Sequence, residues 1–309
     1  MSAEGLPGFE QEAKSETFFE SQFAVKEKLR VAGGIAEVMD IKPDNPKTEV
    51  PVFFGPAWGC TLEVYKPALR TLVEQNRRVI SLNHPRIGGE NLKDISPQEA
   101  VEKYPNEELR KALNVIDVLN QKGIEQVDAV THSESAVNVV IAAMLHPEKF
   151  RNIVFFAPAG LIGEDTFTRL LKGFSGQSKR AESLKATGHL PEIPLTETEK
   201  NVASVAMKEG LKYFAKNPIR AIKEARDISK SQIHDIIRYL HKEKGIGIIE
   251  MSGVDDPVFP MERMQKMVKA GMIDGFLSLR GGHGEIGNHP ELYMTAAEQM
   301  LTAVEEKKR

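Results

Sequence analysis

The sequence has little cysteine, no long apolar run and no excess of one charge. Its single cysteine, Cys60, excludes an internal disulfide and a Cys-x-x-Cys metal clip, which is typical of a reducing compartment, so we expect the cytoplasm. The longest mostly apolar stretch, Ala136 to Leu145, falls well short of the roughly 20 residues that cross a bilayer, so we expect no membrane span. The first twenty residues contain five Glu and lack the apolar middle of a signal peptide, so we expect no export.

The charges exclude further classes of partner. The 41 Lys and Arg are scattered and balanced by 44 Asp and Glu, which leaves a net charge of −3 and no basic stretch for a nucleic acid. No metal-ligand cluster, P-loop or dinucleotide fingerprint is present, so we predict no cofactor and no metal. With 41% apolar residues among 309, the chain can bury a sizeable core. The sequence does not distinguish a monomer from a homodimer.

Two residue patterns follow one another along the chain. Phe23–Ala32 and Ile35–Ile41 alternate in character around Gly33 and Gly34, which predicts a β-hairpin at the edge of a sheet. After it, short apolar runs alternate with longer stretches of helical spacing, as in the crossovers of a parallel sheet. The strands are predicted at Val50–Gly55, Arg78–Leu82, Gln126–Val130, Ile153–Ala157, Gly247–Met251 and Gly275–Leu279.

Helices are predicted between these strands and in one long insertion. From Leu161 to Lys244 helix signals recur with no convincing strand, and one of these helices spans Ser231–Lys242. The fold class is therefore α/β: a mostly parallel sheet with helices on both faces and an all-helical insertion. The helices outside the insertion are predicted at Leu62–Gln75, Pro97–Gln121 with a break at Pro105, Ala136–Leu145, Pro260–Ala270 and Pro290–Glu305.

The segment Val127–Ile141 is an apolar strand that runs directly into a helix, with Ser133 at the corner. A serine there projects its hydroxyl above the sheet edge, and the N–H groups of the helix start can stabilise an oxyanion. This arrangement predicts a nucleophile for acyl transfer. Ser133 as a plain helix N-cap is the alternative.

This corner resembles the nucleophile elbow of the α/β-hydrolase superfamily, which reads G-x-S-x-G and often G-H-S-x-G. Here the segment is Thr131-His-Ser-Glu-Ser135, which keeps the His-Ser pair and replaces both flanking glycines. Glycine relieves crowding at this tight turn, so the small Thr and Ser must fit in its place. The resemblance implies an α/β-hydrolase-like sheet and a serine hydrolase.

Two later segments resemble the superfamily in the same chain order. Ile248–Pro260 is similar to a late strand followed by G-x-x-D-x-x-x-P, which implies that Asp256 is the acid, with Asp255 as the rival if the loop shifts by one residue. Gly281-Gly-His-Gly284 resembles the Gly-His loop before the last helix, which implies that His283 is the general base. The serine, the aspartate and the histidine then keep the order of the superfamily's triad.

An oxyanion hole needs two N–H donors, and one is expected from Glu134, the residue after the nucleophile. If Gly55 matches the superfamily's motif glycine, the second donor falls on Pro56, which has no N–H. If Trp58-Gly59 matches instead, Trp58 supplies the N–H and its indole lines the pocket; we prefer this register. The Glu134 side chain is expected to reach solvent or a cap residue, with a second acid/base or recognition of a cationic or hydroxylated substrate as the alternative.

The leading hypothesis for function is a serine hydrolase of the carboxylesterase type. It would cleave an ester, thioester or lactone bond of a small acyl substrate through an acyl-enzyme. The first alternative is a ligand-binding or scaffold protein whose elbow is impaired. The second is a carbon–carbon bond hydrolase or a cofactor-free perhydrolase that uses the same triad.

The resemblance also divides the chain. Residues 23–160 and 245–309 are expected to form the core domain, residues 161–244 a helical cap, and residues 1–22 a polar leader whose order the sequence leaves open. An apolar substrate pocket is expected between core and cap, although the same side chains can simply hold the two together. Its predicted lining is Trp58, Phe167, Leu171 and Phe174.

Overall fold

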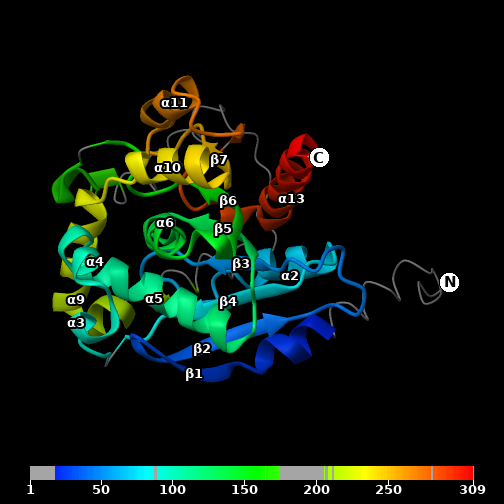
Figure 1. Ribbon diagram of the computed structural model, residues 1–309, viewed down its shortest axis with the longest axis horizontal. Coiled ribbons are helices and arrows are strands. Elements are labelled where there is room, and N and C mark those ends of the chain that lie inside the picture. The colour runs from blue at the N-terminus through cyan, green and yellow to red at the C-terminus, as the bar shows by residue number, and fades with distance from the viewer. Residues whose placement is uncertain are drawn as a thin grey trace.

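The computed structural model arranges the chain around one eight-stranded sheet (Figure 1). It describes residues 18–86, 89–163, 165–170, 172–173, 205, 208–210, 212–279 and 281–308. The strand order is β1-β2-β4-β3-β5-β6-β7-β8. The strands are β1 (Glu27–Val31), β2 (Gly34–Ile41), β3 (Val52–Gly55), β4 (Val79–Asn83), β5 (Val127–His132), β6 (Phe150–Phe156), β7 (Gly247–Gly253) and β8 (Gly275–Leu279).

The sheet is mostly parallel. Strand β3 pairs in parallel with β4 and β5, and β5, β6, β7 and β8 continue the parallel pairing, whereas β2 runs antiparallel to both β1 and β4. A parallel pair needs a crossover connection, which is why stretches of helical spacing separate the apolar runs. The predicted α/β class is confirmed, and the carboxyl ends of β3 to β8 meet at one edge of the sheet.

The predicted N-terminal hairpin is confirmed, but its predicted first strand begins too early. Strand β1 pairs with β2 so that Val31 lies opposite Gly34. Residues 18–24 form a helix instead of strand, because Phe19 and Phe23 stack with ring centroids 5.5 Å apart and are buried against the core. This helix begins before the predicted end of the leader at residue 22. Residues 1–17 of that leader lie outside the described residues.

The six predicted parallel strands are all present, with ends that differ by up to three residues. Strand β6 begins at Phe150, earlier than predicted, and ends at Phe156 because Ala157 has a φ of 43°, which no strand residue adopts. Strands β5 and β7 each extend two residues beyond their predicted ends, to His132 and Gly253. The catalytic motifs expected from the sequence therefore follow these strands directly.

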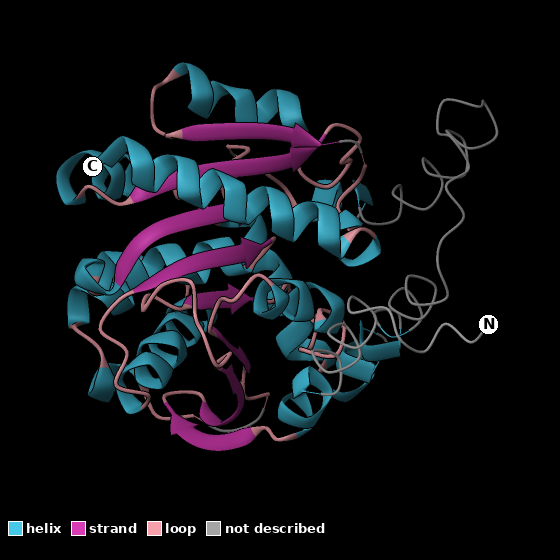
Figure 2. Ribbon diagram, turned by 90° about the vertical axis from the view of Figure 1, so that its right-hand side faces the viewer, coloured by secondary structure: helices cyan, strands magenta, loops and turns pink. Residues whose placement is uncertain are grey.

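Helices cover both faces of the sheet. Helix α13 lies across one face in Figure 2. Along β3 the side chains alternate, so that Phe53 belongs to the core on the α5 and α6 side and Phe54 to the core on the α2 and α13 side. The helices are α2 (Lys66–Glu74), α3 (Leu92–Ile95), α4 (Gln98–Lys103), α5 (Asn106–Gln121), α6 (Ser135–Leu145), α9 (Pro218–Lys230), α10 (His234–Lys244), α11 (Met261–Lys269), α12 (Glu285–Asn288) and α13 (Pro290–Lys308), with a 3-10 turn at Pro147–Lys149.

Two of the predicted helix boundaries can be compared with the structure. The break at Pro105 is confirmed, since α4 ends at Lys103 and α5 begins at Asn106. The first crossover helix starts at Lys66, later than the predicted Leu62, because residues 62–65 form turns. In the part of the chain that the structure describes, no helix is long and apolar enough to cross a membrane.

The described residues between 161 and 244 are helical or irregular, with no strand among them. Helix α10 begins at His234 rather than Ser231; it buries Ile237 and Leu240, with Ile233 buried just before its start and Ile236 half-buried. Helix α9 has Pro218 at its first position, which is a common helix start. Helix α9 lies beside α5 (Figure 1).

Candidate active site

Ser133 lies where β5 ends and α6 begins, and its φ of 58° is in the left-handed region. A residue with a Cβ adopts this conformation only where the surroundings hold it. Here the N–H of Ser133 donates to the carbonyl of Phe156 (3.0 Å), and the carbonyl of Ser133 accepts from the N–H of Ala159 (3.1 Å). The serine is 3% exposed. The strained turn thus fixes the direction of its hydroxyl.

The residues that replace the flanking glycines fit because a glycine stands on the neighbouring strand. The Ser135 hydroxyl donates to the carbonyl of Gly55 on β3 (2.7 Å) and accepts from the N–H of His132 (2.8 Å). A Cβ added to Gly55 would lie 2.7 Å from the Cβ of Ser135. At the other flank, the Thr131 hydroxyl donates to the carbonyl of Val154 (3.3 Å). In the usual elbow, a glycine at the position of Ser135 lets the helix pack closely on the neighbouring strand. Here Gly55 on β3 leaves the space instead, so the helix can carry Ser135.

The structure brings Ser133, His283 and Asp256 into one line. The Nε2 atom of His283 lies 3.0 Å from the Ser133 hydroxyl, and its Nδ1 atom lies 2.9 Å from Oδ2 of Asp256. Because a carboxylate only accepts, Nδ1 carries the proton, and Nε2 can accept the proton of the serine. All three residues are buried. The arrangement suits proton transfer from a serine nucleophile.

Asp256, and not its neighbour Asp255, lies against the imidazole. Its other oxygen, Oδ1, accepts from the N–H groups of Val258 (2.7 Å) and Phe259 (3.0 Å), so the carboxylate also closes a turn after β7. This loop packs on the loop after β8 without space for side chains, since a Cβ on Gly253 would lie 2.3 Å from the carbonyl oxygen of Gly281. The turn and the close packing hold the carboxylate at the imidazole.

His132, the residue before Ser133, joins the loop after β3 to the loop after β8. Tyr65 accepts from the N–H of Ala57 (3.1 Å) and donates to Nδ1 of His132 (2.6 Å). Nε2 of His132 then donates to the carbonyl of His283 (2.9 Å). Burial lowers the pKa of His132 to about 3, so its ring is neutral and keeps this direction of hydrogen bonding. The sequence showed this histidine but gave no sign of its partners.

Glu134 occupies the position expected of an oxyanion donor. It is the N-cap of α6, and no described residue accepts a hydrogen bond from its backbone N–H. The second expected donor, Trp58, lies in the loop after β3, where the N–H of the preceding Ala57 is already bonded to Tyr65. Beside it, burial raises the pKa of the Cys60 thiol to about 11, so this cysteine stays neutral.

The Glu134 side chain does not reach solvent, contrary to our first expectation. It is 3% exposed, and Oε1 accepts from Nζ of Lys111 on α5 (2.5 Å). Burial would lower the pKa of Lys111, but the carboxylates of Glu134 and Glu224 raise it well above its usual value. Glu108 is also fully buried here, and burial together with the charge of Glu134 raises its pKa well above the ordinary range. An ammonium therefore offsets the charge next to the nucleophile.

Glu224 on α9 ties the insertion to this side of the core. Its carboxylate accepts from the indole N–H of Trp58 (3.0 Å) and from the Tyr213 hydroxyl, and lies 3.2 Å from Nζ of Lys111. Burial works against its ionisation, yet Lys111, Tyr213 and Arg220 hold its pKa at about 2. The Trp58 indole thus points toward α9 and packs edge-on against Phe214 at 5.1 Å. The sequence gave no indication of Glu224 or Lys111.

The other predicted pocket residues are only partly described. Phe167 is half-buried in the helical residues 167–170, whereas Leu171 and Phe174 lie outside the described residues. The apolar pocket therefore stays a prediction. No group of three or more His, Cys, Asp or Glu that could hold a metal ion occurs among the residues that the structure describes.

Comparison with known proteins finds likeness in fold. No family model and no curated protein matches the chain. An esterase from Thermogutta terrifontis with bound malate matches with a TM-score of 0.60 at 17% identity, over 91% of this chain and 99% of that chain. The enol-lactonase from Burkholderia xenovorans gives 0.62 at 14% identity, over 89% and 100%. An esterase from a Rhodococcus species gives 0.61 at 13% identity, over 90% and 99%.

Gly55→Ala tests the contact that replaces the elbow glycine. The new Cβ overlaps Ser135, so we expect the free energy of unfolding, measured by urea denaturation, to fall by about 1 to 3 kcal/mol. Ser135→Gly in the same chain should recover most of this loss. The control is Gly210→Ala, at a helical position with open space around it, which should lose nothing. A Gly55→Ala protein as stable as the wild type would contradict this packing.

The buried His132 predicts a loss of stability in acid. Its folded pKa of about 3 lies below the ordinary 6.5, so the unfolded chain binds a proton that the folded chain excludes, and stability falls as pH drops from 6.5 toward 3. His132→Gln should reduce the slope of unfolding free energy against pH, between pH 4 and 6, by up to about 1.4 kcal/mol per pH unit. Equal slopes in the wild type and the variant would refute the assignment.

Proposed function

Since the chain has the α/β-hydrolase fold, we propose that it is a serine hydrolase that cleaves an ester, thioester or lactone bond with Ser133 as nucleophile. One observation carries the proposal: a serine in a left-handed turn at a strand end, 3.0 Å from an imidazole that is itself 2.9 Å from a carboxylate. A plain N-cap serine would bond to its own helix start, whereas the N-cap of α6 is Glu134 and the Ser133 hydroxyl lies at hydrogen-bond distance from Nε2 of His283.

In the proposed reaction, Nε2 of His283 takes the proton of Ser133 while the hydroxyl oxygen attacks the acyl carbon. Asp256 holds Nδ1 and stabilises the imidazolium that forms. The imidazolium then returns its proton to the leaving alcohol, thiol or ring oxygen, and the acyl-enzyme remains. A water molecule, deprotonated by the same imidazole, releases the acid.

The tetrahedral intermediate carries a negative oxygen that needs fixed donors. We assign the N–H of Glu134 and, from the loop after β3, the N–H of Trp58. The Glu134 carboxylate would repel this oxygen from close by, and the Lys111 ammonium at 2.5 Å offsets that repulsion. Lys111 is in this sense a positioning residue, which acts through Glu134.

We also propose that residues 161–244 act as a cap over the site. The support is the buried Glu224 on α9, which contacts Lys111 on α5 and Trp58 in the loop after β3. Phe167 is a candidate for the apolar wall of the substrate pocket. Ser133 rather than a carboxylate at the elbow separates this chain from epoxide hydrolysis, which in this superfamily uses an aspartate. Carbon–carbon bond hydrolysis and perhydrolysis would use the same residues, and the ester is the simplest substrate to test.

Three features favoured a purely ligand-binding protein: the replaced elbow glycines, Glu134 beside the nucleophile and Pro56 in the oxyanion loop. The hydrogen-bonded contact of Ser135 with Gly55 speaks against the first, since the tight turn forms without the usual glycine. An active enzyme is therefore the better supported proposal.

Ester hydrolysis tests this function. With p-nitrophenyl acetate, Ser133→Ala, His283→Ala and Asp256→Asn should each lower kcat by about 10³-fold or more, because each breaks the same proton path. Ser278→Ala, at an exposed serine on β8, should keep the wild-type rate. The proposal fails if the folded wild-type protein shows no turnover, or if Ser133→Ala retains it.

A further inference from the structure

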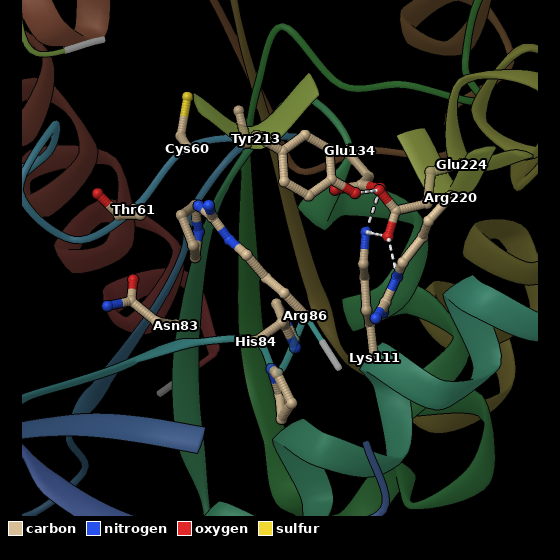
Figure 3. A pocket seen from close by; sticks show the side chains of 14 residues that line it. Cys60, Thr61, Asn83, His84, Arg86, Lys111, Glu134, Tyr213, Arg220 and Glu224 are labelled. Carbon is tan, nitrogen blue, oxygen red and sulfur yellow. Dashed lines mark hydrogen bonds and ion pairs between the residues drawn. The ribbon is translucent and has the colours of Figure 1, made fainter. Parts of the chain in front are cut away.

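A polar pocket lies beside the turn that carries Ser133, toward β4 and α5 (Figure 3). Its walls come from the loops after β3 and β4, from α5, from the turn itself and from the insertion. Its volume is about 40 Å³, enough for a few waters or one small polar group. We call it the Arg86 pocket, and the lining residues that matter here are Thr61, Arg86, Lys111, Glu134, Arg220 and Glu224.

Two of the three cations in this pocket are already neutralised. Lys111 lies 2.5 Å from Glu134 and 3.2 Å from Glu224. Arg220 lies 3.2 Å from Glu224 and 3.1 Å from Glu107. These contacts are of hydrogen-bond length, so neither cation needs a ligand.

Arg86 is different. It makes no hydrogen bond with any residue that the structure describes, and its nearest carboxylate oxygen, on Glu209, is 3.8 Å away. Its guanidinium lies over the Tyr213 ring at 5.0 Å, and its side chain is 26% exposed. Figure 3 shows the guanidinium on the Cys60 side of the pocket, away from Lys111 and Glu134. Stacking fixes the plane of the guanidinium and leaves its N–H edge for a planar anion.

A second group without a hydrogen bond among the described residues lies in the same wall. The Thr61 hydroxyl is buried and has no hydrogen-bond partner among the described residues. Buried hydroxyl groups are normally bonded, so an unbonded one in a pocket wall points to a ligand that supplies the bond.

The charge of the lining selects the ligand. Lys111 and Arg220 each have a carboxylate oxygen at hydrogen-bond length, whereas the carboxylate nearest to Arg86 is 3.8 Å away, so the N–H groups of Arg86 are the ones that can donate to a ligand. A carboxylate matches the fork of an arginine in shape. The small volume also favours a carboxylate over a larger group.

The pocket adjoins the nucleophile. Glu134, which directly follows Ser133, lines it, as do Ala57 and Gly59 from the loop after β3. A molecule attacked by the serine can therefore extend a short arm past Glu134 into the pocket.

We propose that the Arg86 pocket binds a carboxylate carried by the substrate, so that the enzyme prefers half-esters of short dicarboxylic acids to neutral esters. This rests on the proposed function and names the substrate class of the same site. Arg86 supplies the paired donors and Thr61 the third hydrogen bond.

The test compares p-nitrophenyl hydrogen glutarate with p-nitrophenyl valerate, which differ only in a terminal carboxylate. Arg86→Met should lower kcat/KM for the half-ester by about 10- to 100-fold, mainly through KM, because a hydrogen-bonded charge is lost. The valerate should change less than about threefold. Thr61→Val should lower the half-ester value by about 3- to 10-fold, and Arg86→Lys should recover part of the loss. Arg238→Met, an exposed arginine on α10, is the control and should change neither substrate.

Binding separates this proposal from the proposed function. Monomethyl glutarate should bind the Ser133→Ala protein in calorimetry, dimethyl glutarate more weakly, and Arg86→Met should abolish the difference. If the wild type hydrolyses neither ester while this Arg86-dependent binding persists, the serine chemistry is wrong and the carboxylate site stands. If both esters are hydrolysed and folded Arg86→Met changes them equally, the carboxylate site is wrong and the hydrolase stands.

Discussion

The contact between Gly55 on β3 and Ser135 on α6 is the constraint on which the site depends. Two elements can meet at 2.7 Å between their Cβ positions only if one of them has no side chain. Because the glycine is on the strand, the helix can carry a serine whose hydroxyl bonds to both flanking backbones. The turn between them then takes the left-handed φ that aims Ser133 at His283. The close packing of β3 on α6 thus determines the direction of the Ser133 hydroxyl on which the proposed chemistry depends.

The charged side chains beside the serine are buried, and Lys111, Glu134 and Glu224 each lie against an opposite charge. Lys111 offsets the buried Glu134, and Glu224 connects that pair to the insertion. A buried charge without its partner costs several kcal/mol, so these residues hold α5, α9 and the turn in one arrangement. The neutral side chains of His132 and Tyr65 also hold parts of the site together, because their hydrogen bonds link the loops after β3 and β8. Arg86 is the cation that this network leaves without a hydrogen bond, which is why we assign it to the substrate.

Much of the fold was predictable because strands and helices are local patterns. The parallel strands, the Pro105 break and the hairpin follow from periodicity and turn residues, and Ser133, Asp256 and His283 follow from short motifs at strand ends. What the sequence did not reveal depends on partners far away in the chain. Glu134 meets Lys111 from 23 residues away, His132 meets Tyr65 from 67, and Ser135 meets Gly55 from 80. No local pattern records such pairs, so the glycine missing at position 135 looked like a defect.

The most direct test of the central claim is the site of covalent modification. The folded protein is treated with a fluorophosphonate, digested, and its peptides are analysed by mass spectrometry. A serine activated by the imidazole at 3.0 Å should carry one equivalent of the adduct on Ser133, and His283→Ala should lose nearly all of it. An adduct on another residue, or none on the folded wild-type protein, would contradict the account.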